Sequence, residues 1–379
     1  MEEKIKIAFF ISNLGQGGAE YQFVQLIKGL NRTKFDVYVY LYAYQKEAFF
    51  KELFSFNDTK VFTNKLNNEK VIFKIFEALS YIRNVLSTQR FDCVYTSLFM
   101  NGFFVRLASP RSYRNRIIAS VRSSIKNYHY YYKIFIYAEK LLIKNSFLVF
   151  NSVSALSEFK PIFKAKYHHR LSMIYNGFLF QDVSKNLERA SSKITIGGMG
   201  RQSKEKNFLQ IARVVPTINR NDHLCQEINL ILQGEVGDQT VEIEDQRRKN
   251  SRNIQIREPN PKIDEFFSEI DIMVLPSLFE GCPNVLFESM IHRRICIISE
   301  GANSDDFVIN GKNGLVYDGT DEGLLLSLNE ALSIRGTKVS KEIVENAYQF
   351  VTQSFDMTTM VNNYEELFSR ICEKNKSRY

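Results

Sequence analysis

The alternation of apolar and polar residues in the first half of the chain predicts strands and helices that follow one another in turn. Short apolar runs at Ile5–Ile11 and Val37–Tyr44 are typical of strands. Ala19–Leu30 and Val71–Leu86 instead place their apolar residues at the spacing of one helix face. Three more short strands are expected, at Cys93–Tyr95, Ile117–Val121 and Leu148–Phe150. This alternation predicts a parallel sheet with crossover helices.

The same pattern begins again after a polar, weakly periodic stretch at residues 182–193, which we interpret as a linker. A second set of strands is expected at Ile194–Gly198 and near Ile228–Leu232, Ile254–Ile256, Ile272–Leu275 and Ile295–Ser299. The length of 379 residues also favours two domains, each with its own core. The predicted fold class is therefore α/β, with two Rossmann-like, doubly wound domains.

Two glutamates flank a turn in the second half of the chain. Glu280 follows the apolar run Asp271–Ser277, and Glu288 lies about one turn into a helix for which Asn284 is the predicted N-cap. Ligands of open α/β sheets bind at this carboxyl edge. Ionised carboxylates accept hydrogen bonds from vicinal hydroxyls, so a ribose or a hexose is a suitable ligand. The alternative, two surface acids beside a turn, fits this strand–loop–helix context less well.

Arg201 and Lys206 follow the strand that ends at Gly200, again at a carboxyl edge. A guanidinium can hold two phosphate oxygens, an ammonium supplies a point charge, and the helix starting near Asn207 adds partial positive charge. Without this context, two unrelated surface cations would be the better interpretation.

Three glycines, Gly15, Gly17 and Gly18, follow the first strand. Glu20 stands where a dinucleotide fingerprint would have its third glycine, so an NAD site is not expected. Backbone amides of such a loop can approach a diphosphate or an acceptor, although a simple tight turn remains the alternative.

The residues Leu275-Pro-Ser-Leu-Phe-Glu-Gly-Cys-Pro-Asn-Val-Leu-Phe-Glu-Ser289 resemble the E-x7-E signature of retaining GT-B glycosyltransferases of family 4. Other segments resemble that family in the same order, namely Ser12–Glu20, Ile174–Gly177, Gly198–Asn207 and Gly311–Tyr317. The resemblance implies two domains that face a cleft, here residues 1–181 and 194–355. It also implies a last helix, within residues 356–379, that crosses back to the first domain.

The resemblance further implies roles for individual residues. Glu288 would bind the donor ribose, Glu280 would contact the sugar near the reacting centre, and Arg201 and Lys206 would stabilise the leaving diphosphate. Arg122 stands where many members have a histidine; it stays protonated and cannot act as a base, but it could bind a phosphate. Further donor-binding positions are expected at Gly200, Gly281 and Asn284.

The implied reaction is transfer of a hexose or N-acetylhexosamine from a nucleotide sugar to a growing lipid-linked surface glycan such as lipopolysaccharide or capsule. A UDP-sugar is the favoured donor. Retention of configuration is expected, without a metal or other cofactor, since no D-x-D pair follows a predicted strand. Two alternatives are a non-catalytic nucleotide-sugar or glycan-binding module of the same fold and a two-domain solute-binding protein. The latter would need a signal peptide, which the acidic start of the sequence does not resemble.

Composition and charge bear on location and partners. Five scattered cysteines predict neither disulfides nor a zinc site, and no apolar run is long enough to span a bilayer. A cytoplasmic protein, or one on the inner face of the cell membrane, is therefore expected. Of the net charge of +8, the segment Arg111–Lys144 carries +7, from eight basic residues and the acid Glu139. Basic residues interleaved with tyrosines can bind nucleic acid or an anionic membrane, and a solvated helix face is the alternative. The family resemblance favours membrane, so nucleic acid is not expected.

Overall fold

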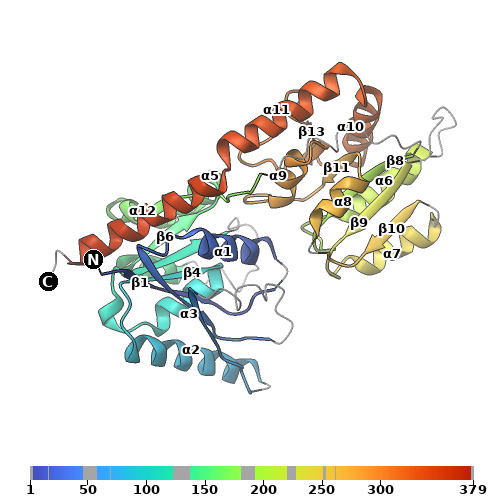
Figure 1. Ribbon diagram of the computed structural model, residues 1–379. Coiled ribbons are helices and arrows are strands. Elements are labelled where there is room, and N and C mark those ends of the chain that lie inside the picture. Colours follow the sequence, from blue (N-terminus) through green and yellow to red (C-terminus); the bar gives the residue numbers. More distant parts are fainter. Residues whose placement is uncertain are drawn as a thin grey trace. The chain divides into compact units, whose positions relative to one another are not determined.

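The structure is a computed structural model that describes residues 3–15, 17–45, 58–68, 70–122, 137–180, 193–219, 228–250, 253–260 and 262–376 (Figure 1). The chain divides into two compact units. Unit 1 comprises Met1–Gly177 together with Met357–Tyr379, and unit 2 comprises Phe178–Asp356. Each unit contains its own parallel sheet with helices, so the predicted class of two Rossmann-like domains is confirmed.

Unit 1 is built on seven parallel strands in the order β3-β2-β1-β4-β5-β6-β7. Their bounds are β1 Ile5–Ile11, β2 Phe35–Leu41, β3 Thr59–Thr63, β4 Cys93–Ser97, β5 Ile117–Val121, β6 Ser146–Phe150 and β7 Leu171–Met173. The chain reverses its direction of travel across the sheet between β1 and β4. The carboxyl ends of these two strands therefore form the place where such sheets bind ligands.

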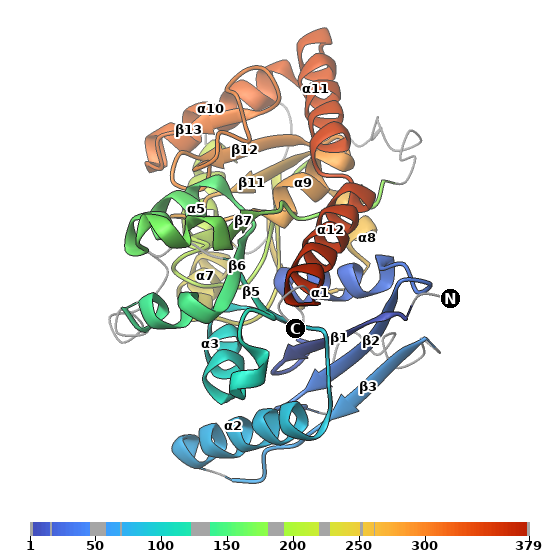
Figure 2. The ribbon, with the colours of Figure 1, turned by 90° about the vertical axis from the view of Figure 1, so that its left-hand side faces the viewer.

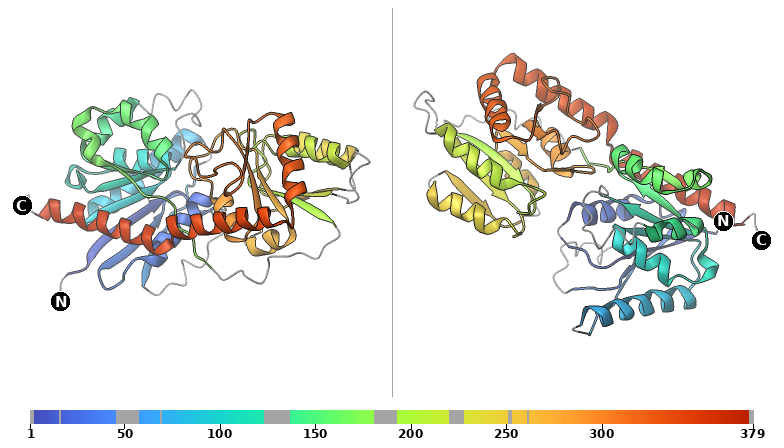
Figure 3. Two further views of the ribbon diagram at one scale, coloured as in Figure 1. Left: turned by 90° about the horizontal axis from the view of Figure 1, so that it is seen from above. Right: turned by 180° about the vertical axis from the view of Figure 1, so that it is seen from behind.

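Helices cover both faces of this sheet (Figure 2). Their bounds are α1 Gly18–Gly29, α2 Val71–Thr88, α3 Phe99–Ala108, α5 Val153–Phe159 and α12 Met357–Lys376, with short 3-10 turns at Arg111–Tyr113, Ile143–Asn145, Lys160–Ile162 and Ala165–Arg170. Helices α1 and α12 share one core with β1, whereas α2 and α3 belong to the core on the opposite face. Both termini of the chain lie in unit 1 (Figure 3).

Unit 2 has six parallel strands in the order β10-β9-β8-β11-β12-β13. Their bounds are β8 Ile194–Met199, β9 Ile228–Gln233, β10 Ile254–Arg257, β11 Ile272–Leu275, β12 Ile295–Ser299 and β13 Leu315–Tyr317. Its helices are α6 Phe208–Asn219, α7 Thr240–Lys249, α8 Ile263–Glu269, α9 Asn284–Ile291, α10 Asp321–Ile334 and α11 Lys338–Ser354. Here the reversal falls between β8 and β11.

Some predicted bounds differ from the structure. Strand β2 ends at Leu41, because its partner β1 ends at Ile11, which pairs with Leu41. Strands β3, β7 and β13 were not predicted. Strands β7 and β13 have three residues each, too few to show a pattern. Residues 181–192, most of the predicted linker, lie outside the described residues. In the part of the chain that the structure describes, no helix combines the length and apolarity needed to cross a bilayer.

Candidate functional site

The two glutamates of the predicted acidic pair lie on the connection from β11 to α9. Glu280 is in the loop after Leu275, and Glu288 is in the second turn of α9. Both are thus at the carboxyl edge of the unit 2 sheet, next to the reversal between β8 and β11. The predicted N-cap was wrong by one residue: Pro283 is the N-cap, without a side-chain bond, and Asn284 is the first helical residue. The buried Gly281 lies in the same loop.

The Glu280 carboxylate is held by two donors. Its Oε1 accepts hydrogen bonds from the Lys206 ammonium and from the Ser277 hydroxyl, the latter at 2.7 Å. The Ser304 hydroxyl donates to the Glu280 carbonyl at 3.1 Å. The side chain of Glu280 is 12% exposed, and that of Lys206 is 32% exposed. The ion pair thus brings together two predicted catalytic residues that are far apart in the sequence.

The loop that carries Lys206 runs from the end of β8 to the start of α6 and packs backbone to backbone against the loop after β9. A Cβ atom on Gly234 would lie 1.9 Å from the carbonyl oxygen of Gly200, and one on Gly237 would lie 2.4 Å from that of Gln202. Only glycine allows such approaches. Sequence reasoning noted these two glycines as a departure from the family pattern and gave them little weight. They fix the course of the loop between Gly200 and Lys206.

Arg201 begins this loop and is less tightly held than Lys206. Its Nε donates to Oε2 of Glu235 at 3.3 Å, and its side chain is 64% exposed. An exposed ion pair of this kind contributes little stability. The guanidinium can therefore leave Glu235 for a stronger anion at small cost. With Lys206, it supplies positive charge beside the start of α6, where helix amides add to the attraction for a phosphate.

Glu288 differs from Glu280 because its carboxylate has no hydrogen-bond or ion-pair partner among the described residues. The side chain is partly buried. Burial first, and then the negative charge of Asp264 on α8, raise the pKa of the Glu288 carboxyl to about 7. A carboxylate in this state has unused acceptor capacity for ligand hydroxyls.

His292, which sequence reasoning missed, caps the C-terminal end of α9 one turn after Glu288. Its Nδ1 lies 2.7 Å from the carbonyl oxygen of Glu288, and its Nε2 lies 2.8 Å from Oδ1 of Asp264. The ring stacks on Phe267 of α8 with centroids 4.5 Å apart. The spacing of four residues from Glu288 was the available signal, since such residues are neighbours on a helix.

The remaining predicted residues belong to unit 1. Gly15 and Gly17 lie between β1 and α1, where Gly17 is the N-cap, and Gly18 is the first residue of α1. A Cβ atom on Gly17 would lie 2.2 Å from Oε2 of Glu20, so the Glu20 carboxylate closes over the turn.

Arg122 follows β5, and two neutral side chains contact its guanidinium. Its Nη1 donates to Oδ1 of Asn176 at 2.9 Å, and its Nη2 lies 3.5 Å from the Tyr95 hydroxyl. Asn176 belongs to the segment that the sequence matched to the family, and the next residue, Gly177, exchanges two hydrogen bonds with the Gln22 amide. The positive charge of Arg122 is thus fixed at the carboxyl edge of the unit 1 sheet.

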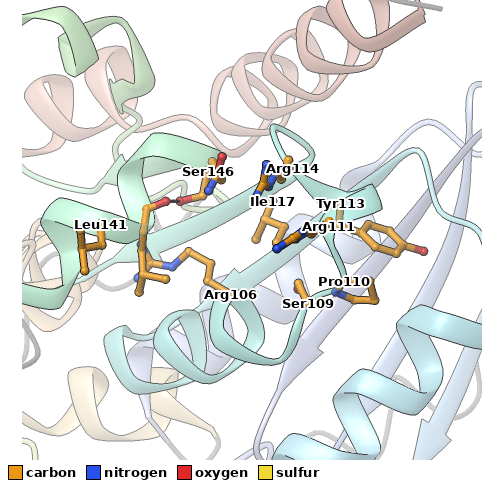
Figure 4. Close-up of a pocket in the computed structure, with 11 residues that line it drawn as sticks. Arg106, Ser109, Pro110, Arg111, Tyr113, Arg114, Ile117, Leu141 and Ser146 are labelled. Atoms are coloured by element: carbon orange, nitrogen blue, oxygen red, sulfur yellow. Dashed lines mark hydrogen bonds between the residues drawn. The ribbon is translucent and has the colours of Figure 1, made fainter.

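The basic segment Arg111–Lys144 is described only in part, because residues 123–136 lie outside the described residues. Its acid, Glu139, makes a buried two-bond ion pair with Arg106. Arg106, Arg111 and Arg114 line a cavity of about 210 Å³ (Figure 4). The cavity reaches the first residues of β5 and β6, at the edge of the sheet opposite to that of Arg122.

Comparisons with known proteins extend these observations. The model described as Glycosyltransferase Family 4 matches residues 16–178, and that described as Glycosyl transferases group 1 matches residues 180–350. The capsular polysaccharide biosynthesis glycosyltransferase CapH of Staphylococcus aureus is 26% identical, over 78% of this chain and 81% of CapH. An alpha-1,4-N-acetyl-D-galactosaminyltransferase of Campylobacter jejuni, named for an acceptor on PP-undecaprenol, is 22% identical over 91% of this chain and 93% of its own.

Solved structures agree in fold. Anabaena HepE in complex with UDP and glucose matches with a TM-score of 0.75 at 18% identity, over 97% of this chain and all of HepE. A glycosyltransferase from Rickettsia africae matches with a TM-score of 0.74 at 17% identity, over 98% of this chain and 99% of its own. At these identities the likeness shows the GT-B fold, as the sequence predicted.

Proposed function

The chain belongs to the group 1 glycosyltransferases, and we propose that it transfers a hexose or N-acetylhexosamine from a nucleotide sugar to a growing glycan with retention of anomeric configuration. The observation that carries this proposal is the convergence of three side chains at one sheet edge of unit 2. Lys206 and Glu280 are paired there, and Glu288, on the helix that follows, has an unused carboxylate. A sugar nucleotide offers a partner for each: hydroxyls for the carboxylates and a diphosphate for the cation.

We assign the ribose hydroxyls of the donor to Glu288 and the transferred sugar to Glu280. The unpaired Glu288 carboxylate gains charge-assisted bonds without first losing others, which favours binding. Glu280 is oriented by Ser277 and Lys206, as a group that must contact one face of a sugar should be. A UDP-sugar is the favoured donor, since the fold neighbour HepE has been solved with UDP.

In the proposed reaction, the bond from the anomeric carbon to the diphosphate oxygen breaks, and a bond from that carbon to an acceptor oxygen forms on the same face. The acceptor proton passes to the leaving diphosphate. Negative charge grows on the diphosphate, and Lys206 and Arg201 supply opposite charge to it. Arg201 can do so because its ion pair with Glu235 is exposed and weak. No metal ion is required in this proposal, so EDTA should leave transfer unchanged.

For the acceptor, we propose a lipid-linked glycan of a capsule or another surface polysaccharide, reached at the membrane surface. The names of the relatives from Staphylococcus aureus and Campylobacter jejuni support a surface glycan and a polyprenyl carrier. Exposed apolar residues at the start of α2 support contact with lipid, and Lys70 and Lys74 lie beside them. The apolar residues are Val71, Ile72, Phe73 and Phe76, which are 51–73% exposed. Anionic lipid attracts such lysines, as it would the segment Arg111–Lys144.

Donor binding and transfer are tested in separate experiments. UDP-, GDP- and ADP-sugars should be screened for protection against thermal unfolding, and the best one tested for transfer to a polyprenyl-linked glycan. A shift with one nucleotide class and a product of retained configuration are expected. Protection without transfer to any acceptor would instead favour a non-catalytic binding module. Absence of protection by all three classes would contradict the proposal.

Membrane contact is tested with vesicles. Replacing Ile72 and Phe76 together by Ser should weaken cosedimentation with anionic vesicles, because apolar contact is lost. Replacing Arg114, Lys126 and Lys133 together by Glu should weaken it too, and added salt should reduce binding of the wild type. Equal binding to anionic and neutral vesicles would contradict the electrostatic part. No binding to either would favour an acceptor in solution.

A further inference from the structure

A small cavity in unit 1 is lined by three arginines that no step of the proposed reaction uses. It lies at the amino ends of β5 and β6, and Arg106, Arg111 and Arg114 form part of its wall (Figure 4). Its volume is about 210 Å³, whereas pockets for drug-sized ligands have about 300–1,000 Å³. The cavity therefore suits a group of the size of a phosphate with a few attached atoms, and it is too small for a whole sugar nucleotide.

The three arginines of the cavity wall differ in how their charge is compensated. The Arg106 guanidinium is neutralised by the Glu139 carboxylate in the buried two-bond ion pair. Arg111 and Arg114 are exposed, and neither forms an ion pair or a side-chain hydrogen bond with the residues that the structure describes. The uncompensated positive charge of the wall therefore comes from Arg111 and Arg114.

These two arginines belong to one turn of 3-10 helix. The turn is Arg111–Tyr113, Arg114 is its C-cap, and the Arg114 amide donates to the Arg111 carbonyl at 3.2 Å. Side chains three residues apart eclipse one another in a 3-10 helix, so the turn places both guanidinium groups on one side. Their like charges repel each other, and an anion between them offsets that repulsion. Each planar guanidinium can also bond to two oxygens of a phosphate at once.

The opposite part of the cavity wall is apolar and exposed. Leu141 lines the cavity and is 64% exposed. Tyr137, one turn earlier in the helical residues 137–142, is 66% exposed, and the Lys140 ammonium lies 4.7 Å from the centroid of its ring. Residues four apart are neighbours on a helix face, so Tyr137 and Leu141 form one exposed apolar strip. A phosphate joined to hydrocarbon, as in a phospholipid headgroup, matches cations and apolar side chains in this arrangement.

We propose that this cavity is a phosphate-binding site, in which Arg111 and Arg114 hold the phosphate of an anionic lipid headgroup and Leu141 contacts the adjoining hydrocarbon. The buried pair of Arg106 and Glu139 joins α3 to the helical residues 137–142, and so holds the cationic and apolar parts of the wall together. The inference does not rest on the donor site, whose residues belong to unit 2. It deepens the membrane part of the proposed function, because it replaces a general attraction to charge with a defined pocket.

The experiment titrates the full chain with dihexanoyl phosphatidylglycerol, a short-chain lipid kept below its micelle concentration, and follows binding by NMR of the ligand. Arg111→Gln combined with Arg114→Gln should weaken affinity about tenfold or more, because charge-assisted hydrogen bonds to the phosphate are lost. The matched control combines Lys160→Gln with Lys164→Gln, which removes two exposed charges of unit 1 outside the cavity lining. The control should bind the lipid as the wild type does.

A second pair of variants separates a pocket from a charged surface. Arg111→Lys combined with Arg114→Lys keeps the net charge but removes the planar forks that bond to two oxygens. Affinity should fall about threefold or more in this variant. Full affinity in the lysine variant, or an equal loss in the control at residues 160 and 164, would show that charge alone attracts the lipid and would overturn the inference. Unchanged affinity in the glutamine variant would overturn it as well.

The source of the phosphate is tested by comparing the lipid with glycerol 3-phosphate, which has the phosphate but no hydrocarbon. The lipid should bind more tightly, and Leu141→Ser should weaken binding of the lipid alone. Equal binding of both compounds, without an effect of Leu141→Ser, would refute the lipid and leave a soluble phosphate ester as the ligand. Arg111, Arg114 and Leu141 are exposed, so these variants should fold, which thermal unfolding checks.

Failure of this inference and failure of the proposed function give different results. If no nucleotide sugar protects the wild type against thermal unfolding but the lipid binds as predicted, the donor assignment is wrong and the cavity remains a phosphate site. If nucleotide sugars protect the protein but neither the lipid nor glycerol 3-phosphate binds, the phosphate site is wrong and the proposed transfer reaction stands.

Discussion

The raised pKa of the Glu288 carboxyl predicts that donor affinity depends on pH near neutrality. In the free protein, burial and Asp264 raise the pKa of this carboxyl to about 7. Ribose hydroxyls donate hydrogen bonds to the ionised form, so the pKa of the same group falls when donor binds. Affinity should therefore be full above pH 7 and decline as the pH falls through 7. It should level off only near the lower pKa of the complex.

The size of this effect follows from the fraction of ionised carboxylate. A group of pKa about 7 is roughly nine-tenths ionised at pH 8 and one-tenth at pH 6, so affinity should fall about tenfold, or about 1.4 kcal/mol, between them. Calorimetric titration with UDP-glucose measures it. This ligand is preferred to UDP, whose terminal phosphate loses a proton near pH 6. Proton release on binding, seen as dependence of the heat on the buffer, should be largest below pH 7, between the pKa of the complex and that of the free protein.

Glu288→Gln is the matched control, because the amide has the same shape but does not titrate. Its affinity should be independent of pH over this range and, at pH 8, weaker by about 1.5–3 kcal/mol, the contribution of hydrogen bonds to a charged group. If the variant shows the same decline as the wild type, another group is responsible. If the wild type shows no decline, Glu288 does not bind the donor in its ionised form.

Further predictions concern the neighbouring residues. Lys206→Ala should lower transfer about 10²-fold at saturating donor, because charge on the leaving group loses a fixed cation, whereas Lys204→Ala on the exposed side of the same loop should not. Glu280→Ala should lower turnover more than it lowers affinity for donor, as steady-state kinetics would reveal. Gly234→Ala should destabilise unit 2 by about 1–3 kcal/mol in denaturant unfolding, because its Cβ would lie 1.9 Å from the Gly200 carbonyl oxygen. Wild-type turnover in EDTA should match that with Mg²⁺.

Much of the fold could be predicted from sequence because long apolar runs specify buried parallel strands. Strands β1 and β5 were predicted at their full length, and β11 matched as well. The three-residue strands β7 and β13 could not be predicted, since their limits depend on pairing with a neighbour. Tertiary pairing likewise ended β2 at Leu41, although apolar residues continue beyond it.

The candidate site was predictable only where position along a strand determines position in space. Glu280 and Lys206 were each expected at a carboxyl edge, and adjacency of β8 and β11 in the sheet brings them into contact. The Ser277 hydroxyl that orients Glu280, and the approach of Gly234 to Gly200, depend on how loops fold over one another. Such contacts have no periodic signature in the sequence.

The contrast between the two glutamates connects the stability of unit 2 with its chemistry. Glu280 is compensated by Lys206 and Ser277, whereas Glu288 is partly buried without a compensating bond among the described residues. Because the ionised form is disfavoured in the folded chain, Glu288 destabilises the ligand-free protein above its pKa of about 7, and this penalty is absent below the pKa of an unfolded glutamate, near 4.3. Glu288→Gln should therefore raise the unfolding temperature at pH 8 but not at pH 4. Donor should raise the unfolding temperature of the wild type by more than it raises that of Glu288→Gln, because the donor supplies the hydroxyls that the fold does not. A binding group that costs stability until its ligand arrives is what selection for function, rather than for stability, leaves in a structure.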